Sequence, residues 1–498
     1  MQKIKYILCF MVIYDTIYRT GKSLRWKMIL KDLLGDKKFW GTILGLAIPI
    51  AVQNLLQSSF VLVDTLMVGQ LGDVSLAAVG MAGQWSWLLN MLTFGVCSGA
   101  SIFLSQYFGE KNKKGMVHTY SVAIISGLLF SILFLLVGLL APEAVIKVFN
   151  RDAAVVSEGV TYLKIAVFSY PGIMINMLIN MVLRSTQRVK LPMYVSLFTT
   201  VLNAFLDYGL IFGAFGLPQL GVRGAALATV ISSWMGPVNI FTIMAFTRDD
   251  IFFAPIKEMV GFDFGFVKRF YRNALPVILN ETLWGLGTVV YNVIFSNMGY
   301  EYTAAVSILR TFENISLTVF VGLTNASCVC VGQNIGGGKI KEGIKNSKRF
   351  MVLVPLAGLI IGAFVVLFRT HLVEIFNMGN TISDKTLVAA KAIMIVYGIE
   401  VAVRNIPYVA IVGIFRSGGD TKNGMKYDLM CLWLISIPMT FIASVVLKLP
   451  FVAVFACSYL CEDYLKAILC IKHFNSNRWI KPVTDTGKAA LKEYLGEV

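Results

Sequence analysis

The chain has 498 residues, of which 57% are hydrophobic and only 14% are charged, and its formal net charge is +16. Soluble domains carry about 25% charged residues, so this composition excludes a set of soluble domains. The basic residues are expected in short loops beside anionic lipid headgroups, which disfavours a nucleic-acid-binding protein.

Apolar segments long enough to cross a bilayer recur along the chain. A helix needs about 20 apolar residues to span the hydrocarbon core. This criterion predicts twelve spans, near residues 41–66, 76–108, 116–140, 161–183, 191–213, 225–246, 273–296, 303–333, 350–368, 390–413, 427–447 and 449–472. The predicted fold class is therefore an all-α polytopic membrane protein.

The basic residues orient these helices. With the N-terminus inside, and with Lys391 and Lys472 at span ends counted with the adjoining segments, the inner segments hold 33 Lys and Arg and the outer loops hold 7. Cytoplasmic loops are enriched in Lys and Arg. We therefore predict a multi-pass protein of the cell (plasma or inner) membrane with both termini in the cytoplasm.

The second half of the sequence repeats the first. Residues recur at a shift of 227 and later of 232, and the repeated positions include Pro49 and Pro276, Gln106 and Gln333, Gly109 and Gly336, and Ser185 and Ser417. Each copy holds six predicted spans, and because six is even, both copies enter the membrane in the same direction. The two lobes are then related by a pseudo-twofold axis along the membrane normal, as in secondary transporters with a site between the halves.

The repeat divides the chain into segments. They are a cytoplasmic N-terminal extension, a first lobe, a cytoplasmic linker, a second lobe and a cytoplasmic tail, at residues 1–39, 40–246, 247–272, 273–473 and 474–498. Pro49 and Pro276 fall early in the first span of each lobe, where a proline removes a backbone hydrogen bond and bends the helix. We predict a hinge at both positions, with a static kink as the alternative.

Two acidic residues fall inside spans of the first lobe. Asp64 and Asp207 are both predicted in the outer half of the membrane, and Asn203 precedes Asp207 by one helical turn on the same face. Ionisable groups in hydrocarbon are costly and usually functional. At least one acid can therefore load and release a proton or hold a sodium ion. A carboxyl group satisfied by neighbouring hydroxyls and amides is the alternative.

The second lobe carries both signs of charge near mid-membrane depth, in Glu281, Arg310, Glu313, Glu400 and Arg404. Glu400 and Arg404 have the acid-first i,i+4 spacing that favours an ion pair within one helix, and Arg310 is predicted to neutralise Glu313. Those pairings leave Glu281 as the acid predicted to be free. A local salt bridge is expected near the inner end of the last span, among Glu462, Asp463 and Lys466.

Several stretches resemble the signatures of the multidrug and toxic compound extrusion (MATE) transporters. They are AIPIAVQNLLQSSFVLVDTLMVGQLGDVSLAAVG (47–80), RSTQRVKLPMYVSLFTTVLNAFLDYGLIFG (184–213), GVRGAALAT (221–229), ALPVILNETLWGLG (274–287) and FRSGGDTK (415–422). The resemblance covers roughly residues 40–475, in order, and does not include residues 1–39.

The resemblance implies a cation pocket. In proton-coupled members an aspartate on the first helix and an Asn-x-x-x-Asp pair on the fifth form this pocket, and Asp64, Asn203 and Asp207 match those motifs. Thr229 matches a further residue. An acid on the seventh helix corresponds to Glu281, although sodium-coupled members carry it further beyond the proline than here.

Polar and aromatic residues between the lobes are candidates for a substrate cavity, namely Gln84, Trp85, Asn90, Asn280 and Trp284. Aromatic and Met side chains suit a loose, adaptable cavity. The stretch GQNIGGGKI (332–340) lacks the Lys-Ser/Thr of a phosphate-binding loop, so an ion gradient is predicted to supply the energy. No cofactor is expected beyond the coupling ion, and no metal beyond Na⁺.

The predicted function is a secondary antiporter that exports amphipathic, cationic drugs or xenobiotics in exchange for H⁺ or Na⁺. Its expected partners are membrane lipids and small organic cations, not nucleic acid, and it is expected to be a monomer. A lipid-linked saccharide flippase is one alternative, but it would need a lobe cavity rich in Arg and Lys, and few buried bases are expected here. A membrane-embedded enzyme would need a His/Asp/Cys cluster, which three scattered histidines do not supply.

Overall fold

The computed structural model describes residues 35–247, 249, 251–376 and 382–496. The chain divides into two compact units, residues 1–42 and 43–498. Most of the predicted N-terminal extension, residues 1–34, lies outside the described residues. Apart from the start of α3 at residues 37–42, the features below belong to the second unit.

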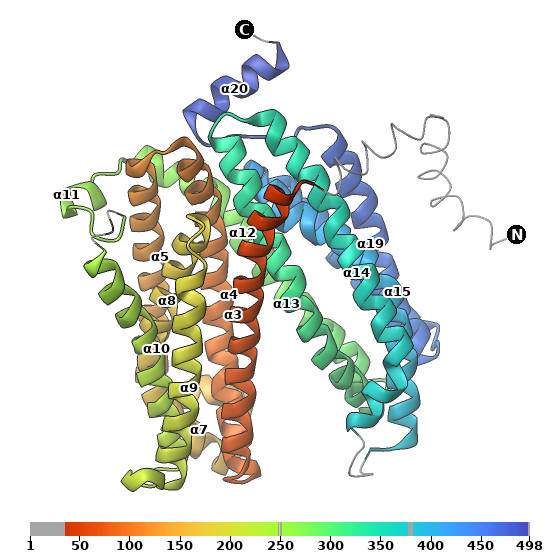
Figure 1. Cartoon of the computed structure of the whole chain (residues 1–498). Helices are drawn as coiled ribbons and strands as arrows, with labels where there is room; N and C mark the ends of the chain where they lie inside the picture. Colours follow the sequence, from red (N-terminus) through yellow and green to blue (C-terminus); the bar gives the residue numbers. More distant parts are fainter. Residues whose placement is uncertain (1–34, 248, 250, 377–381, 497–498) are drawn as a thin grey trace, which may run out of the picture. The chain divides into compact units, whose positions relative to one another are not determined.

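The described residues form helices and no strands (Figure 1). The long helices of the first half are α3 (Lys37–Gly69), α4 (Asp73–Glu110), α5 (Lys113–Leu140), α7 (Ala153–Ala166) continued through η1 (Val167–Ser169) into α8 (Tyr170–Ser185), α9 (Lys190–Phe212) and α10 (Val222–Phe246). Those of the second half are α12 (Phe264–Ser296), α13 (Tyr300–Gly336), α14 (Ile340–Phe376), α15 (Asp384–Tyr408), α17 (Thr421–Leu429) and α19 (Phe451–Asn475). Short elements are α6 (Pro142–Phe149), η2 (Ala214–Gly216), α11 (Ile256–Met259) and α20 (Asp485–Leu495).

Two helices of the second half continue through π-helical turns. α15 runs on through η3 (Val409–Phe415) into α16 (Arg416–Gly418), and α17 through η4 (Met430–Ser436), α18 (Ile437–Phe441) and η5 (Ile442–Val446). Pro407 lies at the end of α15 and Pro438 at the start of α18. Since proline cannot donate the i−4 backbone hydrogen bond, wider turns near it are expected.

Eleven described helices, counting each continued run as one, are long and apolar enough to cross a membrane. The twelfth predicted span corresponds to α19, whose 25 residues include Glu462, Asp463 and Lys466. These charges pair with one another inside the lobe. The twelve predicted spans are thus all present as helices.

Each half packs around its own central helices. In the first half α4 contacts α5, α7 and α8, and α9 packs on α10; in the second half α15 contacts α13, α14 and α19. Large apolar side chains on the outer faces remain exposed, among them Leu129, Leu133, Phe364 and Leu367. Such a surface suits lipid contact, because the helices satisfy their backbone polar groups internally.

The two halves meet along α4, α12 and α13. A Cβ atom at Gly99 of α4 would lie 2.5 Å from the Cβ atom of Ala274 in α12, and one at Gly95 would lie 2.7 Å from Cα of Ile278. The two helices can approach this closely because neither glycine has a side chain. Small residues therefore fix the contact between the halves.

Candidate functional site

The first-lobe acids lie close together. Asp207 on α9 is fully buried and Asn203, one turn earlier, is buried beside it, while Asp64 on α3 is half-buried. Asp64 and Asp207 are near enough to interact electrostatically. Within the described residues, neither oxygen of Asp207 has a hydrogen-bond partner of normal geometry, and the Oδ1 atom of Asp64 also has none.

Two hydroxyl groups complete this cluster. Tyr162 on α7 is buried and lies near Asp64, Asp207 and Thr229, the last on α10. The Thr229 hydroxyl oxygen is buried and has no hydrogen-bond partner of normal geometry in the described chain. The structure therefore brings the predicted Asp64, Asn203, Asp207 and Thr229 together and adds Tyr162, which the sequence did not indicate because a tyrosine carries no charge that would mark it within a span.

Asp64 and Tyr162 of this cluster also line a cavity between the two lobes. The cavity has a volume of about 520 Å³. Its wall is formed from the first half by Asp64, Gln84, Trp87 and Tyr162, and from the second half by Gly285, Thr288, Asn292 and Arg310. Asp64, which forms no ion pair with a described residue, thus faces a space that a small organic molecule can enter.

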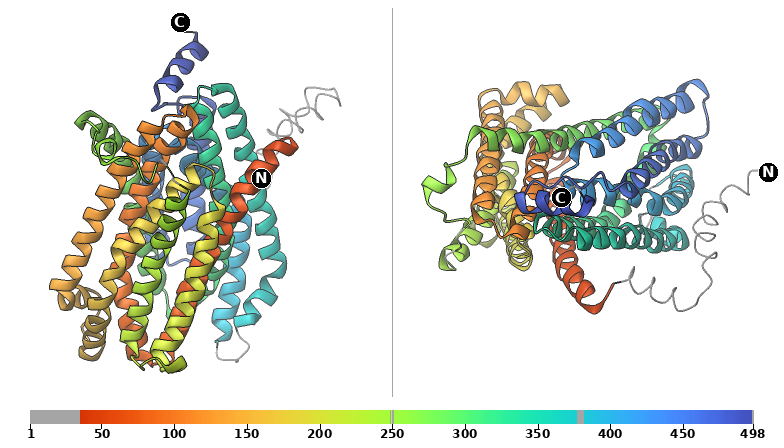
Figure 2. Two further views of the ribbon diagram at one scale, coloured as in Figure 1. Left: turned by 60° about the vertical axis from the view of Figure 1, so that its left-hand side comes forward. Right: turned by 90° about the horizontal axis from the view of Figure 1, so that it is seen from above.

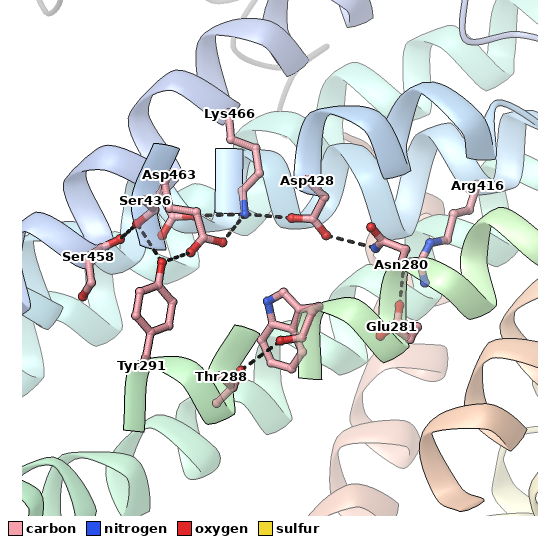
Figure 3. Close-up of polar contacts among 12 residues, drawn as sticks. Asn280, Glu281, Thr288, Tyr291, Arg416, Asp428, Ser436, Ser458, Asp463 and Lys466 are labelled. Carbon is pink, nitrogen blue, oxygen red and sulfur yellow. Dashed lines mark hydrogen bonds and ion pairs between the residues drawn. The ribbon is translucent and has the colours of Figure 1, made fainter. Parts of the chain in front are cut away.

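A second cavity, of about 530 Å³, is lined by the second lobe except for Phe94 of α4 and has charged walls. We call it the second-lobe cavity. Figure 3 shows one part of its lining, in which Lys466 points toward Asp428. The Lys466 ammonium lies 2.9 Å from Asp428 Oδ1 and 2.7 Å from Glu462 Oε1. Asn280 donates to Asp428 at 2.9 Å, and the Tyr291 hydroxyl donates to Glu462 at 3.2 Å. This lysine is therefore held by carboxylates from two different helices, α17 and α19.

Comparison with known proteins identifies the family. The family model described as MatE matches residues 49–209 and 276–442, more than half of the chain. The two matches begin 227 residues apart, which is the shift of the sequence repeat. The chain belongs to the MATE family.

Relatives cover nearly all of this MATE protein. Probable multidrug resistance protein NorM of Thermotoga maritima is 25% identical over 441 residues, which are 88% of this chain and 92% of that protein. Multidrug resistance protein MdtK of Yersinia pestis is 23% identical over 406 residues, 80% of this chain and 86% of its own. A variant of the Vibrio cholerae MATE transporter VcmN has the same fold, with a TM-score of 0.77 at 18% identity over 89% of this chain and 98% of that one.

These findings confirm the predicted family and the all-α, two-lobe, twelve-helix fold. The protein is a multi-pass membrane transporter and not an enzyme.

The predicted ion pairs of the second lobe are wrong. Arg404 pairs with Glu313 on α13 and not with Glu400, whose two carboxylate oxygens have no hydrogen-bond partner in the described chain. Arg310 donates to the Asn292 side chain on α12 rather than neutralising Glu313. Side chains on the facing helices, not the i,i+4 neighbours, are the partners.

Glu281 is also not free. Its carboxylate lies 2.5 Å from the Arg416 guanidinium, which is buried and also donates to Ser98 of α4 at 3.0 Å. The sequence placed Arg416 in an inner loop, whereas the continuation of α15 through η3 and α16 carries it into the interior. The missed signal was the place of Arg416 directly before Ser417, a position that recurs in the sequence repeat.

The predicted cavity residues divide between three places. Gln84 lines the interlobe cavity, and Asn280 and Trp284 line the second-lobe cavity. Trp85 instead packs on Phe134 within the first lobe, with ring centroids 4.4 Å apart, and Asn90 donates to the backbone of its own helix. The expectation of few buried bases is corrected too, since Arg310, Arg404, Arg416 and Lys466 all line the second-lobe cavity.

Proposed function

We propose that this MATE protein is a secondary antiporter that exports amphipathic, cationic organic compounds from the cell in exchange for H⁺ or Na⁺. The observation that carries the proposal is the fully buried Asp207, which has no counter-charge or regular hydrogen bond in the described chain and lies beside Asp64. The names of the NorM and MdtK relatives, both multidrug resistance proteins, support the substrate class.

Antiport follows if the coupling ion and the substrate cannot both be bound by Asp64 and Asp207 at the same time. A buried carboxylate without a partner is costly, so it is occupied by a proton, by a sodium ion or by a cationic substrate. Because the proton and the substrate neutralise the same charge, binding of one weakens binding of the other, and the coupling is reciprocal. Asp64 at the cavity wall takes the substrate cation first, and Asp207 behind it senses the change in charge.

Both coupling ions are compatible with the side chains present. A proton needs only one carboxylate. A sodium ion needs several oxygen atoms, which Asp64, Asp207, Asn203, Thr229 and Tyr162 can supply. We place the protein in the cell membrane as a monomer, with both termini in the cytoplasm.

The bases of the second-lobe cavity do not favour a lipid-linked saccharide flippase. Such a protein would bind phosphates with free Arg or Lys side chains. Arg404, Arg416 and Lys466 are each engaged with a carboxylate. Arg310 alone among these four forms no ion pair with a described residue.

Purified protein in liposomes tests the proposal. We expect ethidium efflux to be driven by a pH gradient or by a sodium gradient, and whichever gradient works identifies the ion. Asp207→Asn and Asp64→Asn should each abolish gradient-driven efflux with normal expression and insertion, since the amide keeps the shape but cannot change charge. The matched control is Asp73→Asn at the exposed start of α4. Full transport by both aspartate variants would refute the first-lobe site.

A further inference from the structure

Arg310 differs from the other bases of the second lobe. It lies half-buried on α13 and lines both the interlobe cavity and the second-lobe cavity. Its guanidinium donates to the Asn292 amide oxygen, a neutral group on α12. Its charge is therefore not matched by an acid of the described chain, whereas Arg404, Arg416 and Lys466 each contact at least one carboxylate.

The interlobe cavity consequently presents both signs of charge. Asp64 lies on its first-lobe wall and Arg310 on its second-lobe wall, and the two side chains form no ion pair with each other. Trp87 and Tyr162 add aromatic surface, and Gln84 and Thr288 add neutral polar groups. An acid and a base held apart across one cavity are complementary to a ligand with two opposite charges.

We propose that the cavity binds zwitterionic substrates, in which a cationic centre lies toward Asp64 and a carboxylate is bound by Arg310. This inference rests on the proposed export function and adds a specificity residue to it. A guanidinium matches a carboxylate with two parallel hydrogen bonds. The hydrogen bond to Asn292 holds the guanidinium in place and leaves its remaining donors available.

A matched pair of dyes tests this assignment. A rhodamine with a free carboxyl group is a zwitterion, and its methyl ester is a cation of nearly the same size. Binding of both to the purified full-length protein in detergent is measured by fluorescence anisotropy. Arg310→Gln should weaken binding of the acid by about tenfold or more, because a charge-assisted hydrogen-bond pair is lost, and should leave the ester within about twofold of its original affinity.

The control is Arg223→Gln, an exposed arginine near the start of α10, which should change neither affinity. Equal weakening of both dyes, no weakening of the acid, or failure of the unaltered protein to bind the acid would each overturn the assignment. Liposome transport of the ester is followed separately. If the ester binds but no gradient drives its export, the export function fails while the binding data still decide the role of Arg310.

An independent set of contacts joins the lobes at the end of the molecule that carries α20. Gln106 near the end of α4 donates from Nε2 to the Ser417 carbonyl oxygen at 2.7 Å, and Gln333 near the end of α13 donates to the Ser185 carbonyl oxygen at 2.8 Å. The sequence repeat relates the two glutamines to each other and the two serines to each other. Each lobe thus donates an equivalent glutamine-to-carbonyl hydrogen bond to the other lobe.

Two glycines bring the backbones together at this point. A Cβ atom at Gly109 would collide with the Gln333 carbonyl oxygen, and one at Gly336 would collide with the Gln106 carbonyl oxygen. These glycines are also related by the repeat. We call the six residues Gln106, Gly109, Ser185, Gln333, Gly336 and Ser417 the inner clasp.

The C-terminal segment covers one side of the inner clasp. Val483 donates its backbone N–H to Gln106 Oε1 at 2.8 Å, and the Thr484 hydroxyl donates to the Gly336 carbonyl oxygen at 3.0 Å. Thr486 adds a bond from its N–H to Glu110 Oε1 at 3.0 Å. Viewed from above, α20 lies over the middle of the helices (Figure 2, right).

We infer that the inner clasp is the gate that closes the predicted cytoplasmic side of the transporter. Its two glutamine bonds are equivalent and span the same interface, so access from the cytoplasm requires both to break. The C-terminal segment, bonded to residues of both lobes, stabilises the closed state.

Hydrogen–deuterium exchange on the full-length protein tests the gate. Gln106→Leu should raise exchange several-fold at residues 415–421 of the opposite lobe, and Gln333→Leu should do so at residues 183–188. Asn334→Leu is the control, because in the described chain the Asn334 side chain donates to Cys330 of its own helix and to no residue of the opposite lobe. Gly336→Ala gives a second route to the same opening if a glutamine variant does not fold. Unchanged exchange in the opposite lobe for the folded variants would overturn the inference.

Discussion

At the scale of single residues, charged side chains of the second lobe form ion pairs with other residues than those that their spacing in the sequence predicts. Glu400 and Arg404 lie one turn apart on α15, yet Arg404 turns to Glu313 on α13 and packs over the Tyr459 ring. Glu400 is left buried without a hydrogen bond in the described chain. Glu313 is therefore part of an ion pair and Glu400 is not. A substitution that breaks the pair of Glu313 and one that removes the charge of Glu400 should have different effects on stability.

We expect Arg404→Ala to destabilise the protein by roughly 3 kcal/mol, because removing one partner leaves the mostly buried Glu313 uncompensated. Glu400→Gln should leave thermal stability unchanged or raise it, since it removes a charge without stranding a base. Thermal aggregation of both variants in detergent measures this contrast. A strong loss of stability in Glu400→Gln would restore the pairing expected from sequence.

At the scale of helices, the close contact of α4 and α12 depends on side-chain size. Gly99→Ala places a methyl group against Ala274 and should destabilise the protein by about 1–3 kcal/mol, as overpacking does. Ala274→Gly in the same chain removes the opposing methyl group and should recover part of the loss.

A double-mutant cycle of thermal stabilities measures the coupling between these two positions. Gly45→Ala on α3, where an added Cβ atom meets nothing within 4 Å, is the control. Additive effects of the Gly99 and Ala274 substitutions would contradict a direct contact between the two side chains.

Helix positions could be predicted from the sequence because the length of an apolar segment is a local property. The outer-half depth of Asp64 and Asp207 could also be predicted, since it follows from span position, and the family resemblance implied that they share a pocket with Asn203. The pairing of charges in the second lobe could not, because it depends on which faces of different helices meet. The π-helical turns after Pro407 changed those faces and carried Arg416 inward, which spacing in a regular α-helix does not reveal.

At the scale of the whole molecule, the C-terminal segment that bonds to both lobes is held to the second lobe by an anchor outside the membrane-spanning segments. Asp420, in the turn between α16 and α17, is buried and is bonded by His473 at 2.7 Å and by Lys481 at 2.8 Å. Asn423 also donates to its carboxylate, and the Lys481 N–H donates to the Gly418 carbonyl oxygen at 2.7 Å. Trp479, fully buried beside this anchor, stacks on Phe474.

The anchor should make stability depend on pH in the acid range. Burial alone would raise the pKa of Asp420, but the hydrogen bonds from His473, Lys481 and Asn423 outweigh it and lower the pKa to about 2. Because the folded pKa lies below the unfolded value of about 3.9, the ionised carboxylate stabilises the protein above about pH 4, and this contribution is lost as the pH falls toward 2. The ionised carboxylate contributes roughly 2 kcal/mol to the free energy of unfolding at neutral pH.

Asp420→Asn should therefore lower the melting temperature at pH 7 and speed hydrogen–deuterium exchange at residues 479–487. The difference in melting temperature from the unaltered protein should shrink as the pH falls below 4. Equal melting temperatures at pH 7 would show that the segment is held by Trp479 and the backbone bonds alone.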